Sequence, residues 1–553
     1  MTNKAATASI IAAVGVVAVI GTIAAVTTSK KASDDGGNMS TSIKLSQLCS
    51  STLYPAKCEN SLTPVVNESS NPEEVLRAAL QVAMNEIGAA FAKYTDVGKG
   101  AADKITLSAI GECKKLLDDA IVDLKDMAGL RADQVVVQVN DLRVWISGVM
   151  TYIYTCADGF DKPELKHAMD KLLRNSTELS SNALAIITRV GQVLATEVVG
   201  TIEDLPNSHR RKLLSAGVFP EWVSSHTRRL LQIPGGLQKP NAVVAADGSG
   251  NFKTITEALN SVPKKSTARF VIYVKAGEYK EYVTVSKDQA NVFMYGDGPT
   301  KTRVIGDKSN KGGFATIATR TFSAEGNGFI CKSMGFVNTA GPDGHQAVAL
   351  HVQGDMSVFF NCRFEGYQDT LYVHANRQFF RNCEVLGTID FIFGNSAAVF
   401  QNCLMTVRKP MESQGNMVTA HGRTDPNMPT GIVLQGCKIV PEDALFPVRQ
   451  TVPSYLGRPW KEYSRTVIME STIGDLIKPE GWSEWMGDLG LKTLYYAEYA
   501  NTGPGAGTSK RVTWPGYRVI GQAEATQFTA GVFIDGMSWL KNTGTPNVMG
   551  FIK

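Results

Sequence analysis

The 553-residue chain lacks the local sequences that mark several common hydrolytic and metal sites. It has no Gly-x-Ser-x-Gly stretch, which argues against a serine esterase of the α/β-hydrolase type. It also has no Asp-Thr-Gly, so an aspartic protease fits poorly. No Cys-x-x-Cys pair or Cys/His cluster has the spacing of zinc ligands, and we therefore predict neither a metal nor a cofactor.

Ionisable residues are missing from one stretch near the N-terminus. None lies between Lys4 and Lys30, and Ala8–Val26 is almost wholly apolar. This stretch is longer than the core of a signal peptide, about 7–15 residues, and approaches the ~20 residues that span a bilayer. We predict a transmembrane signal anchor over residues 1–29, with a cleaved signal peptide as the alternative. Either segment directs the rest of the chain into the secretory pathway.

Nine cysteines in an oxidising compartment predict disulfides, with at least one thiol left over. Four lie in the first half of the chain and five run from Cys331 to Cys437. The secretory pathway also permits N-glycosylation, for which three Asn-x-Ser/Thr sequons are present, at Asn38, Asn67 and Asn175.

Residues 42–201 show a helical pattern. The segment that starts at Asn71 has apolar residues at spacings of three and four, with Asn71 as a candidate N-cap and Pro72 at the first helical position. Two further segments repeat this pattern, and short connections join them. We predict an all-α four-helix bundle without a catalytic constellation of its own.

A polar linker over residues 202–236 contains two similar basic and hydrophobic tetrads, RKLL at 211–214 and RRLL at 228–231. Exposed linkers are preferred sites of proteolysis, so we predict that a protease of the secretory pathway cuts here. A cut after the second tetrad releases a chain that begins near Gln232. A solvated linker whose charges have no role is the alternative.

Residues 237–553 consist of short β-forming runs separated by turns. Three segments align as an internal repeat, and each contains an Asn-Cys pair, at 361/362, 382/383 and 402/403. Periods of twenty to twenty-one residues with short strands are typical of a stacked solenoid. We predict an all-β domain that is a right-handed parallel β-helix.

The same period separates Asp369 from Asp390, so we expect these acids on neighbouring rungs, ~4.8 Å apart in the hydrogen-bonding direction. Two carboxylates this close repel each other, and the partly apolar surround raises a carboxyl pKa further. One acid then keeps its proton while the other stays ionised, which is the arrangement of an acid beside a nucleophile or base. A ladder of turn-capping Asp and Asn residues is the alternative.

Five short sequences resemble the plant pectin methylesterase (pectinesterase) family. They are GEYKEYV at 277–283, HQAVAL at 345–350, YQDTLYVH at 367–374, GTIDFIFG at 387–394 and YLGRPW at 455–460. The helical half is similar to the inhibitor-like pro-region that precedes the enzyme in plant members of this family. The resemblance implies hydrolysis of the methyl esters of cell-wall pectin by a secreted enzyme. It further implies that the mature enzyme is a monomer with no nucleic-acid partner. Inhibitor proteins are further candidate partners.

The resemblance also implies roles for individual residues. Asp390 is the expected nucleophile, and Asp369 is the expected acid and then base. Gln368 and Gln346 are expected to donate hydrogen bonds to the oxyanion. Arg458 is expected to orient Asp390 and to lower its pKa, and Trp460 and Thr316 are expected substrate contacts. One departure stands out, because Arg320 occupies a position at which the family commonly has alanine.

The inhibitor-like fold further implies two disulfides, Cys49–Cys58 and Cys113–Cys156. In the β-helix the repeat stacks cysteines on neighbouring rungs, where they are either bridged or only packed. We predict disulfide bonds at four of these cysteines, and the sequence leaves their pairing open: Cys362, Cys383, Cys403 and Cys437.

Two other functions fit parts of the sequence. A pair of carboxylates on a β-helix also suits hydrolysis of the glycosidic bonds of polygalacturonate. A non-enzymatic protein is the second alternative, in which the helical half inhibits or the β-helix binds the cell wall. Methanol release without new reducing ends distinguishes the esterase from both.

Overall fold

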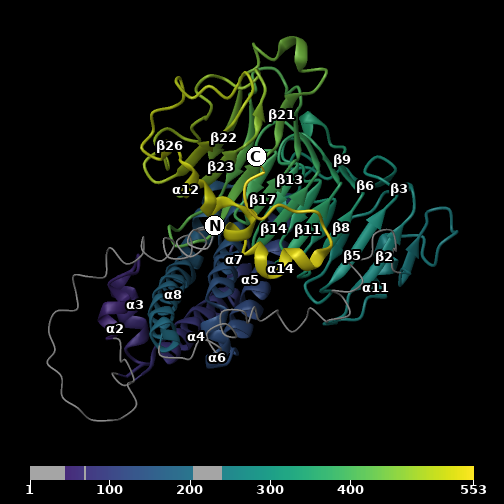
Figure 1. Ribbon diagram of the computed structural model, residues 1–553. Coiled ribbons are helices and arrows are strands. Elements are labelled where there is room, and N and C mark those ends of the chain that lie inside the picture. Colours follow the sequence, from purple (N-terminus) through teal and green to yellow (C-terminus); the bar gives the residue numbers. More distant parts are fainter. Residues whose placement is uncertain (1–43, 68–69, 204–238, 553) are drawn as a thin grey trace, which may run out of the picture. The chain divides into compact units, whose positions relative to one another are not determined.

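The computed structural model describes residues 44–67, 70–203 and 239–552 (Figure 1). The predicted anchor at 1–29, the sequon at Asn38 and both basic tetrads lie outside these residues. Within the described ranges, no helix is both long enough and apolar enough to cross a membrane.

Four long helices form the N-terminal part, which we call the bundle (residues 44–203). They are α4 (Pro72–Phe91), α5 (Lys104–Ala128), α7 (Val139–Asp158) and α8 (Pro163–Glu203). In sequence order α4 packs on α5, α5 on α7 and α7 on α8, and α8 closes the ring on α4. The predicted four-helix bundle is therefore confirmed.

The start of α4 shows why the helix begins where it does. The Asn71 side chain accepts a hydrogen bond from the backbone N–H of Glu74, and the Glu74 carboxylate accepts one from the backbone N–H of Asn71. This capping box satisfies two donors that a helix start leaves without an intrahelical partner. Pro72 follows at the first helical position, as the sequence predicts.

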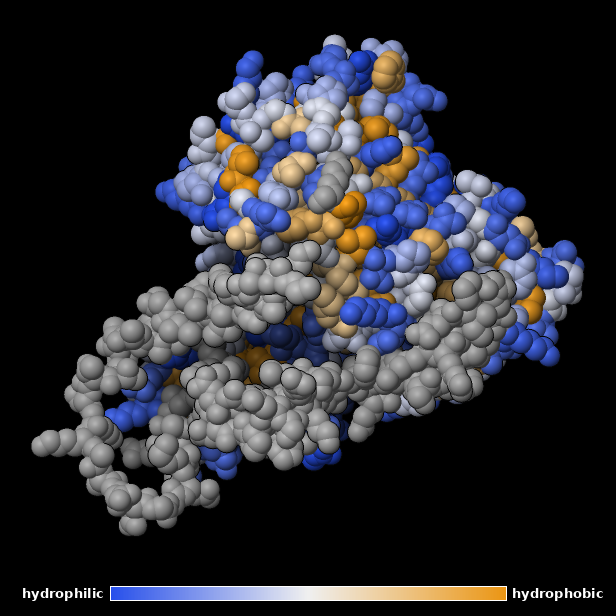
Figure 2. All heavy atoms as spheres, in the orientation of Figure 1, coloured by the Kyte–Doolittle hydropathy of each residue, from blue (hydrophilic) through white to orange (hydrophobic). Residues whose placement is uncertain are grey.

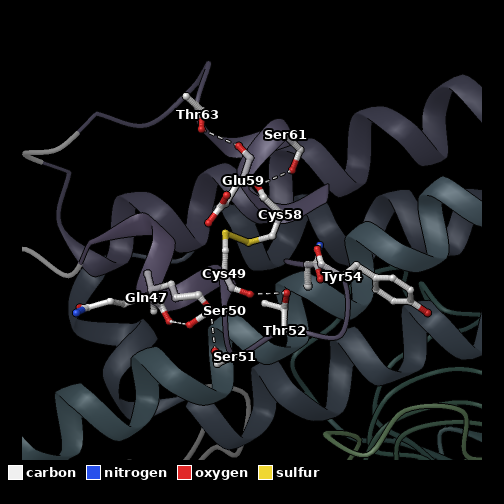
Figure 3. The surroundings of a disulfide bond; sticks show 12 residues. Gln47, Cys49, Ser50, Ser51, Thr52, Tyr54, Cys58, Glu59, Ser61 and Thr63 are labelled. Atoms are coloured by element: carbon white, nitrogen blue, oxygen red, sulfur yellow. Dashed lines mark hydrogen bonds between the residues drawn. A yellow bond between two sulfur atoms is a disulfide. The ribbon is translucent and has the colours of Figure 1, made fainter. Parts of the chain in front are cut away.

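Two disulfides hold the bundle together. Cys49–Cys58 links the short helices α2 (Leu45–Cys49) and α3 (Pro55–Leu62), as Figure 3 shows. Cys113–Cys156 links α5 to α7 across a Cα–Cα distance of 4.4 Å. Both pairings agree with the prediction. Two more short elements complete this part, η1 (Tyr94–Asp96) and α6 (Ala132–Val137).

Residues 239–552 form a parallel β-helix with three sheets (Figure 1). The eleven-stranded sheet contains β1 (Ala242–Val244), β2 (Phe270–Val274), β5 (Val292–Gly296), β8 (Ile330–Lys332), β11 (Ser357–Phe360), β14 (Arg377–Arg381), β17 (Ala397–Gln401), β20 (Gly431–Gln435), β23 (Arg465–Met469), β25 (Tyr495–Tyr499) and β26 (Tyr517–Val519). The eight-stranded sheet contains β3 (Gly277–Tyr279), β6 (Thr302–Gly306), β9 (Gly335–Asn338), β12 (Arg363–Glu365), β15 (Glu384–Gly387), β18 (Leu404–Val407), β21 (Lys438–Pro441) and β24 (Thr472–Ile473).

The seven-stranded sheet is the one that positions the candidate site. It contains β4 (Val283–Val285), β7 (Phe322–Ala324), β10 (Leu350–Val352), β13 (Leu371–Val373), β16 (Ile392–Gly394), β19 (Asn416–His421) and β22 (Ser454–Pro459). Each strand is hydrogen-bonded to the equivalent strand of the next coil, so consecutive coils stack in register. The predicted fold class is confirmed.

Short helices flank the β-helix. Near its N-terminal end lies α11 (Ile255–Asn260), while α12 (Gln522–Ala525), α13 (Ala530–Phe533) and α14 (Gly536–Trp539) pack their apolar side chains on the outer side of the eleven-stranded sheet. Figure 2 shows that the rest of the visible β-helix surface is mostly hydrophilic, with hydrophobic residues in small patches.

The internal repeat has a clear structural role. Asn361, Asn382 and Asn402 adopt left-handed backbone conformations, with φ of 53°, 51° and 53°, a region that asparagine tolerates better than most residues. Phenylalanines one coil apart stack inside, with ring centroids 4.4 Å apart for Phe380 and Phe400. The repeat therefore supplies a turn residue and a core residue to each coil.

The β-helix cysteines correct one prediction. Cys362, Cys383, Cys403 and Cys437, together with Cys331, are free and buried in the core. The Sγ atoms of Cys331 and Cys362 are 3.8 Å apart, far beyond the ~2.05 Å of a disulfide bond. Stacking places these thiols at equivalent inward positions, where they pack as small apolar side chains. The predicted disulfides of the β-helix are therefore wrong.

Candidate active site

One row of side chains crosses the outer side of the seven-stranded sheet. Residues such as Phe322, Leu350 and Leu371 point into the core, so the residues that alternate with them point outward. The strand pairing aligns the outward positions into a row of Thr284, Ser323, His351, Tyr372, Phe393, Ala420 and Arg458. This row runs along the axis of the β-helix.

Asp369 and Asp390 occupy equivalent positions beside the row. Each lies two residues before the first residue of its strand, and those two strand residues, Leu371 and Ile392, are paired. The backbone N–H of Asp369 donates to the carbonyl of Ile389 over 3.0 Å. Both acids have left-handed φ values, 63° and 51°. The two acids are therefore neighbours on adjacent coils, as the period predicts.

Arg458 provides the counter-ion of one acid. Its Nε and Nη2 atoms donate to the two carboxylate oxygens of Asp390 over 2.9 and 2.6 Å. The guanidinium also stacks on the Trp485 ring, 4.2 Å from its centroid. A two-point bond of this kind fixes the carboxylate orientation as well as its charge. Arg458 comes from β22, two strands away from β16 in the sheet.

The two acids have different electrostatic surroundings. Burial and the nearby charge of Asp390 raise the pKa of Asp369 well above its ordinary value. Burial also raises the pKa of Asp390, although the bond from Arg458 opposes this effect. The expected lowering of the Asp390 pKa is therefore wrong, because burial outweighs the guanidinium. Asp390 nevertheless has a bonded cation, so the Arg458 bond favours its charged form, whereas burial and the charge of Asp390 favour the protonated form of Asp369.

The other predicted site residues lie around this pair. Gln368 directly precedes Asp369 and is half-buried, and its carbonyl accepts from the N–H of Ala347, the residue after Gln346. The two glutamines are therefore on neighbouring coils. Thr316 opens η2 (Thr316–Thr319), and the Trp460 ring meets Phe393 edge-on at 5.9 Å.

Sequence reasoning missed the aromatic part of the outward row. Tyr372 and Phe393 stack with centroids 4.2 Å apart, and each lies three residues after one of the acids. The identical spacing was a signal that could have identified the stack. The sequence contains no comparable signal for Trp485, which reaches Arg458 from a distant loop.

The bundle covers this face of the sheet. Thr155 of α7 lies 2.8 Å from Nε2 of His374 and 3.2 Å from the Tyr372 hydroxyl. Asn395 donates to Thr151 of the same helix over 2.9 Å. Tyr372, Phe393 and Ala420 share a hydrophobic cluster with the bundle core. Asp369 and Asp390, beside this covered face, are only 7% and 4% exposed.

No metal site accompanies the pair of acids in the described parts of the chain. Within residues 44–67, 70–203 and 239–552, no group of three or more His, Cys, Asp or Glu side chains could hold a metal ion. The buried charges of the site come from Asp390 and Arg458, which satisfy one another.

Comparison with known families agrees with this geometry. The pectinesterase family model matches residues 241–537, and the plant invertase/pectin methylesterase inhibitor model matches residues 44–186. The chain belongs to the pectinesterase family. It is a pectin methylesterase with an inhibitor-like N-terminal domain, and the matches do not favour the glycosidase alternative.

Individual relatives resemble the chain over most of its length. Pectinesterase 1 of Citrus sinensis is 44% identical over 544 residues, which cover 94% of this chain and 91% of the relative. An Arabidopsis thaliana protein described as a pectinesterase/pectinesterase inhibitor is 45% identical over 515 residues, 91% of this chain and 90% of that protein. The solved pectin methylesterase from carrot is 52% identical with a TM-score of 0.57, and it covers 57% of this chain and 100% of its own.

Proposed function

We propose that Asp390 is the nucleophile of this pectin methylesterase and that Asp369 is its acid and base. The observation that carries the proposal is the two-point bond from Arg458 to Asp390 beside an acid whose pKa is raised well above its ordinary value. The Asp390 carboxylate is thereby charged and oriented, and the neighbouring Asp369 holds a proton that it can donate to the leaving group.

These roles give a balanced reaction. A carboxylate oxygen of Asp390 attacks the methyl-ester carbonyl of a galacturonate unit and forms a tetrahedral intermediate. The methanol oxygen leaves with the proton of Asp369, which produces an acyl anhydride on Asp390. Asp369, now ionised, removes a proton from water, and the resulting hydroxide attacks the same carbonyl. The tetrahedral intermediate expels the Asp390 carboxylate, the galacturonic acid unit departs and loses its proton to solvent, and Asp390 and protonated Asp369 are restored.

Gln368 and Gln346 are the proposed donors to the oxyanion. Their amides are neutral, so they stabilise the negative oxygen without changing the charge of the acids, and one such donor can contribute ~3–4 kcal/mol. Trp460 and Thr316 are the proposed sugar contacts, since Trp460 meets the aromatic row at Phe393. The substrate is methylesterified homogalacturonan, the linear galacturonate polymer of pectin.

We further infer that the bundle silences the enzyme until the linker is cut. Support comes from Thr155 and Thr151 of α7, which bond to residues of the face beside the two acids. Asp158, at the end of α7, also pairs with Lys461 over 2.8 Å, next to Trp460. A substrate chain and the bundle need the same surface.

The experiment compares the uncut chain with the catalytic part. Residues 239–553 produced alone should release methanol from pectin about tenfold faster or more, because a tethered inhibitor acts at an effective concentration near the millimolar range. A chain whose two tetrads are replaced by Gly-Ser serves as the uncut form. Equal rates for the two proteins would contradict silencing but leave the catalytic roles in place.

The cellular context is part of the same proposal. The chain enters the secretory pathway, is cut at one of the tetrads by a resident protease, and acts in the extracellular cell wall. Asn67 and Asn175 are both exposed, which supports their use as glycosylation sites. N-terminal sequencing of the secreted protein identifies the cut tetrad and shows whether residues 1–29 remain as an anchor.

A further inference from the structure

Opposite charges meet where the bundle contacts the β-helix. In four ion pairs the acid belongs to the bundle and the cation to the β-helix, at N–O distances of 2.6 to 2.8 Å: Glu112–Arg320, Asp123–Lys287, Asp141–Arg377 and Asp158–Lys461. One pair has the reverse polarity, Lys115–Glu325. Among the described residues, most ion pairs between the bundle and the β-helix therefore have their cation on the β-helix, although Glu325, Asp355 and Asp425 of the β-helix also contact the bundle.

Arg320 has a special place on that face. It lies two residues before Phe322, the first residue of β7, just as Asp369 lies two residues before Leu371 of β13. Phe322 is paired with Leu350, and Leu350 with Leu371. Arg320 is thus in the column of the catalytic acids, two coils before Asp369, at a distance along the axis of ~10 Å.

The neighbours of Arg320 leave it able to bind a carboxylate. Its Nη1 donates to Glu112 over 2.8 Å and to the carbonyl of Ile317 over 2.5 Å, and the nearest acid of the β-helix itself, Glu325, is 3.9 Å away. Glu325 is also held by Ser323 and Lys115. The Arg320 Nε has no hydrogen-bond partner among the described residues. Among the described residues, Glu112 of the bundle is therefore the one carboxylate within hydrogen-bond distance of the guanidinium.

We infer that Arg320 forms a binding subsite for the free carboxylate of a galacturonate unit that has already lost its methyl ester. This subsite rests on the proposed function, because it assumes that the polymer runs along the column of Asp369 and Asp390. A guanidinium binds a carboxylate through charge-assisted hydrogen bonds, whereas a methyl ester offers it only a neutral oxygen. In the uncut chain, Glu112 takes the place of this carboxylate.

Lys287 is a second cation on this face, but it lies outside the subsite. It follows β4 by two residues and pairs with Asp123 of the bundle over 2.6 Å. The register of β4 with β7 places Lys287 level with Gly326, at the opposite edge of the sheet from Arg320. Arg320 is therefore the cation in the column of Asp369 and Asp390. The consequence of its subsite is a preference for esters that lie near units already de-esterified.

The test uses residues 239–553 alone. This part has a core of its own, and the carrot enzyme, which matches it in extent, was solved as a separate chain. Arg320→Ala is compared with Arg303→Ala, which removes an arginine whose pair with Glu278 is also 2.8 Å long but which lies on β6 of the eight-stranded sheet. Arg320→Gln is a second variant, in case the alanine variant does not fold.

Two readouts separate the subsite from catalysis. The first is the ratio of kcat/KM for half-methylated pectin to kcat/KM for highly methylated pectin, which Arg320→Ala should lower by about three- to tenfold. The second is the affinity for an unesterified oligogalacturonate, measured in the Asp390→Asn background, which should weaken by a similar factor. Arg303→Ala should change neither quantity.

Each outcome has one meaning. An unchanged ratio and an unchanged oligogalacturonate affinity in both Arg320 variants would overturn the subsite. An equal fall in kcat/KM on both pectins, with no loss of oligogalacturonate affinity, would also overturn the subsite and show that Arg320 does not distinguish free from esterified units. A lack of methanol release by the unsubstituted part would contradict the proposed catalytic roles, while the binding measurement would still decide the subsite.

Discussion

The bundle and the β-helix use the same residue type in opposite ways. All four cysteines of the bundle are joined in disulfides, whereas the five cysteines of the β-helix are free thiols inside the core. Two facing helices bring Cys113 and Cys156 together from different parts of the chain. Coil stacking instead repeats one inward position along the axis, where a small apolar side chain is sufficient. Covalent links secure the bundle, and repeated stacking secures the β-helix.

The largest expected effect is confined to the β-helix, the region with the proposed catalytic residues. Asp390→Asn removes the proposed nucleophile, and we expect methanol release from pectin to fall by at least about a thousandfold. Asp443→Asn, at an exposed position of the β-helix, is the matched control and should leave the rate unchanged. The measurement is the initial rate for residues 239–553 produced alone. Activity within tenfold of the unsubstituted enzyme would exclude Asp390 as the nucleophile.

The second expected effect concerns the stacked core of the β-helix. Phe380 stacks on Phe359 and on Phe400 and is fully buried. We expect Phe380→Ala to lower the free energy of unfolding by about 3–5 kcal/mol, through lost burial and a cavity. Phe446→Ala is the control, because Phe446 is 55% exposed. Denaturant unfolding of residues 239–553 measures both variants, and equal stabilities would show that the ladder has no energetic role.

Reduction should affect the bundle more than the β-helix. The Cys113–Cys156 bond closes a segment with a sequence separation of 43, for which loop entropy predicts a stabilisation of ~4 kcal/mol. We therefore expect Cys113→Ser to lower the unfolding temperature of the bundle, as recorded by calorimetry of the whole chain. Cys383→Ala in the β-helix removes a thiol but no bond, so it should cost less. A larger loss of stability for Cys383→Ala than for Cys113→Ser would contradict the expectation that disulfides stabilise the bundle more than single thiols stabilise the β-helix.

The smallest expected effect depends on pH. Burial lowers the pKa of His374 to about 3, below the ordinary value of ~6.5 for histidine. Between these values the unfolded chain binds a proton that the folded chain does not, so stability falls as the pH decreases from about 6.5 toward 3. The slope contributed by this group is at most ~1.4 kcal/mol per pH unit.

His374→Gln isolates that contribution. The variant should lose less stability than the unsubstituted chain over the same acidic interval, because glutamine does not titrate. His167→Gln provides the control from the bundle. Parallel pH profiles for His374→Gln and the unsubstituted chain would show that the buried imidazole has no influence on stability.

Much of the fold could be predicted from local patterns. Asn71, Pro72 and the apolar spacing after them specify the start of α4, and the structure contains the expected capping box. The period of the Asn-Cys pairs predicts the stacked coils and therefore the neighbouring positions of Asp369 and Asp390. These features depend on residues close in sequence or on a repeat, so periodicity is sufficient to find them.

Other features could not be predicted in this way. The repeat indicates that cysteines stack, but whether their sulfurs bond depends on side-chain direction within the core, and here they remain thiols. The pKa of Asp390 was expected to be lowered by Arg458, yet it is raised, because the depth of burial is a property of the assembled protein. Neither quantity follows from spacing along the chain.

The sequence by itself determined the two architectures, the coil period and the adjacency of the two acids, because each follows from hydrogen-bonding geometry that repeats along the chain. Only the tertiary structure decided which surface the bundle covers, with Thr155 on His374 and Glu112 on Arg320, residues about two hundred positions apart. Such contacts require two folded faces that match in shape and charge, and no local pattern in either segment specifies its partner.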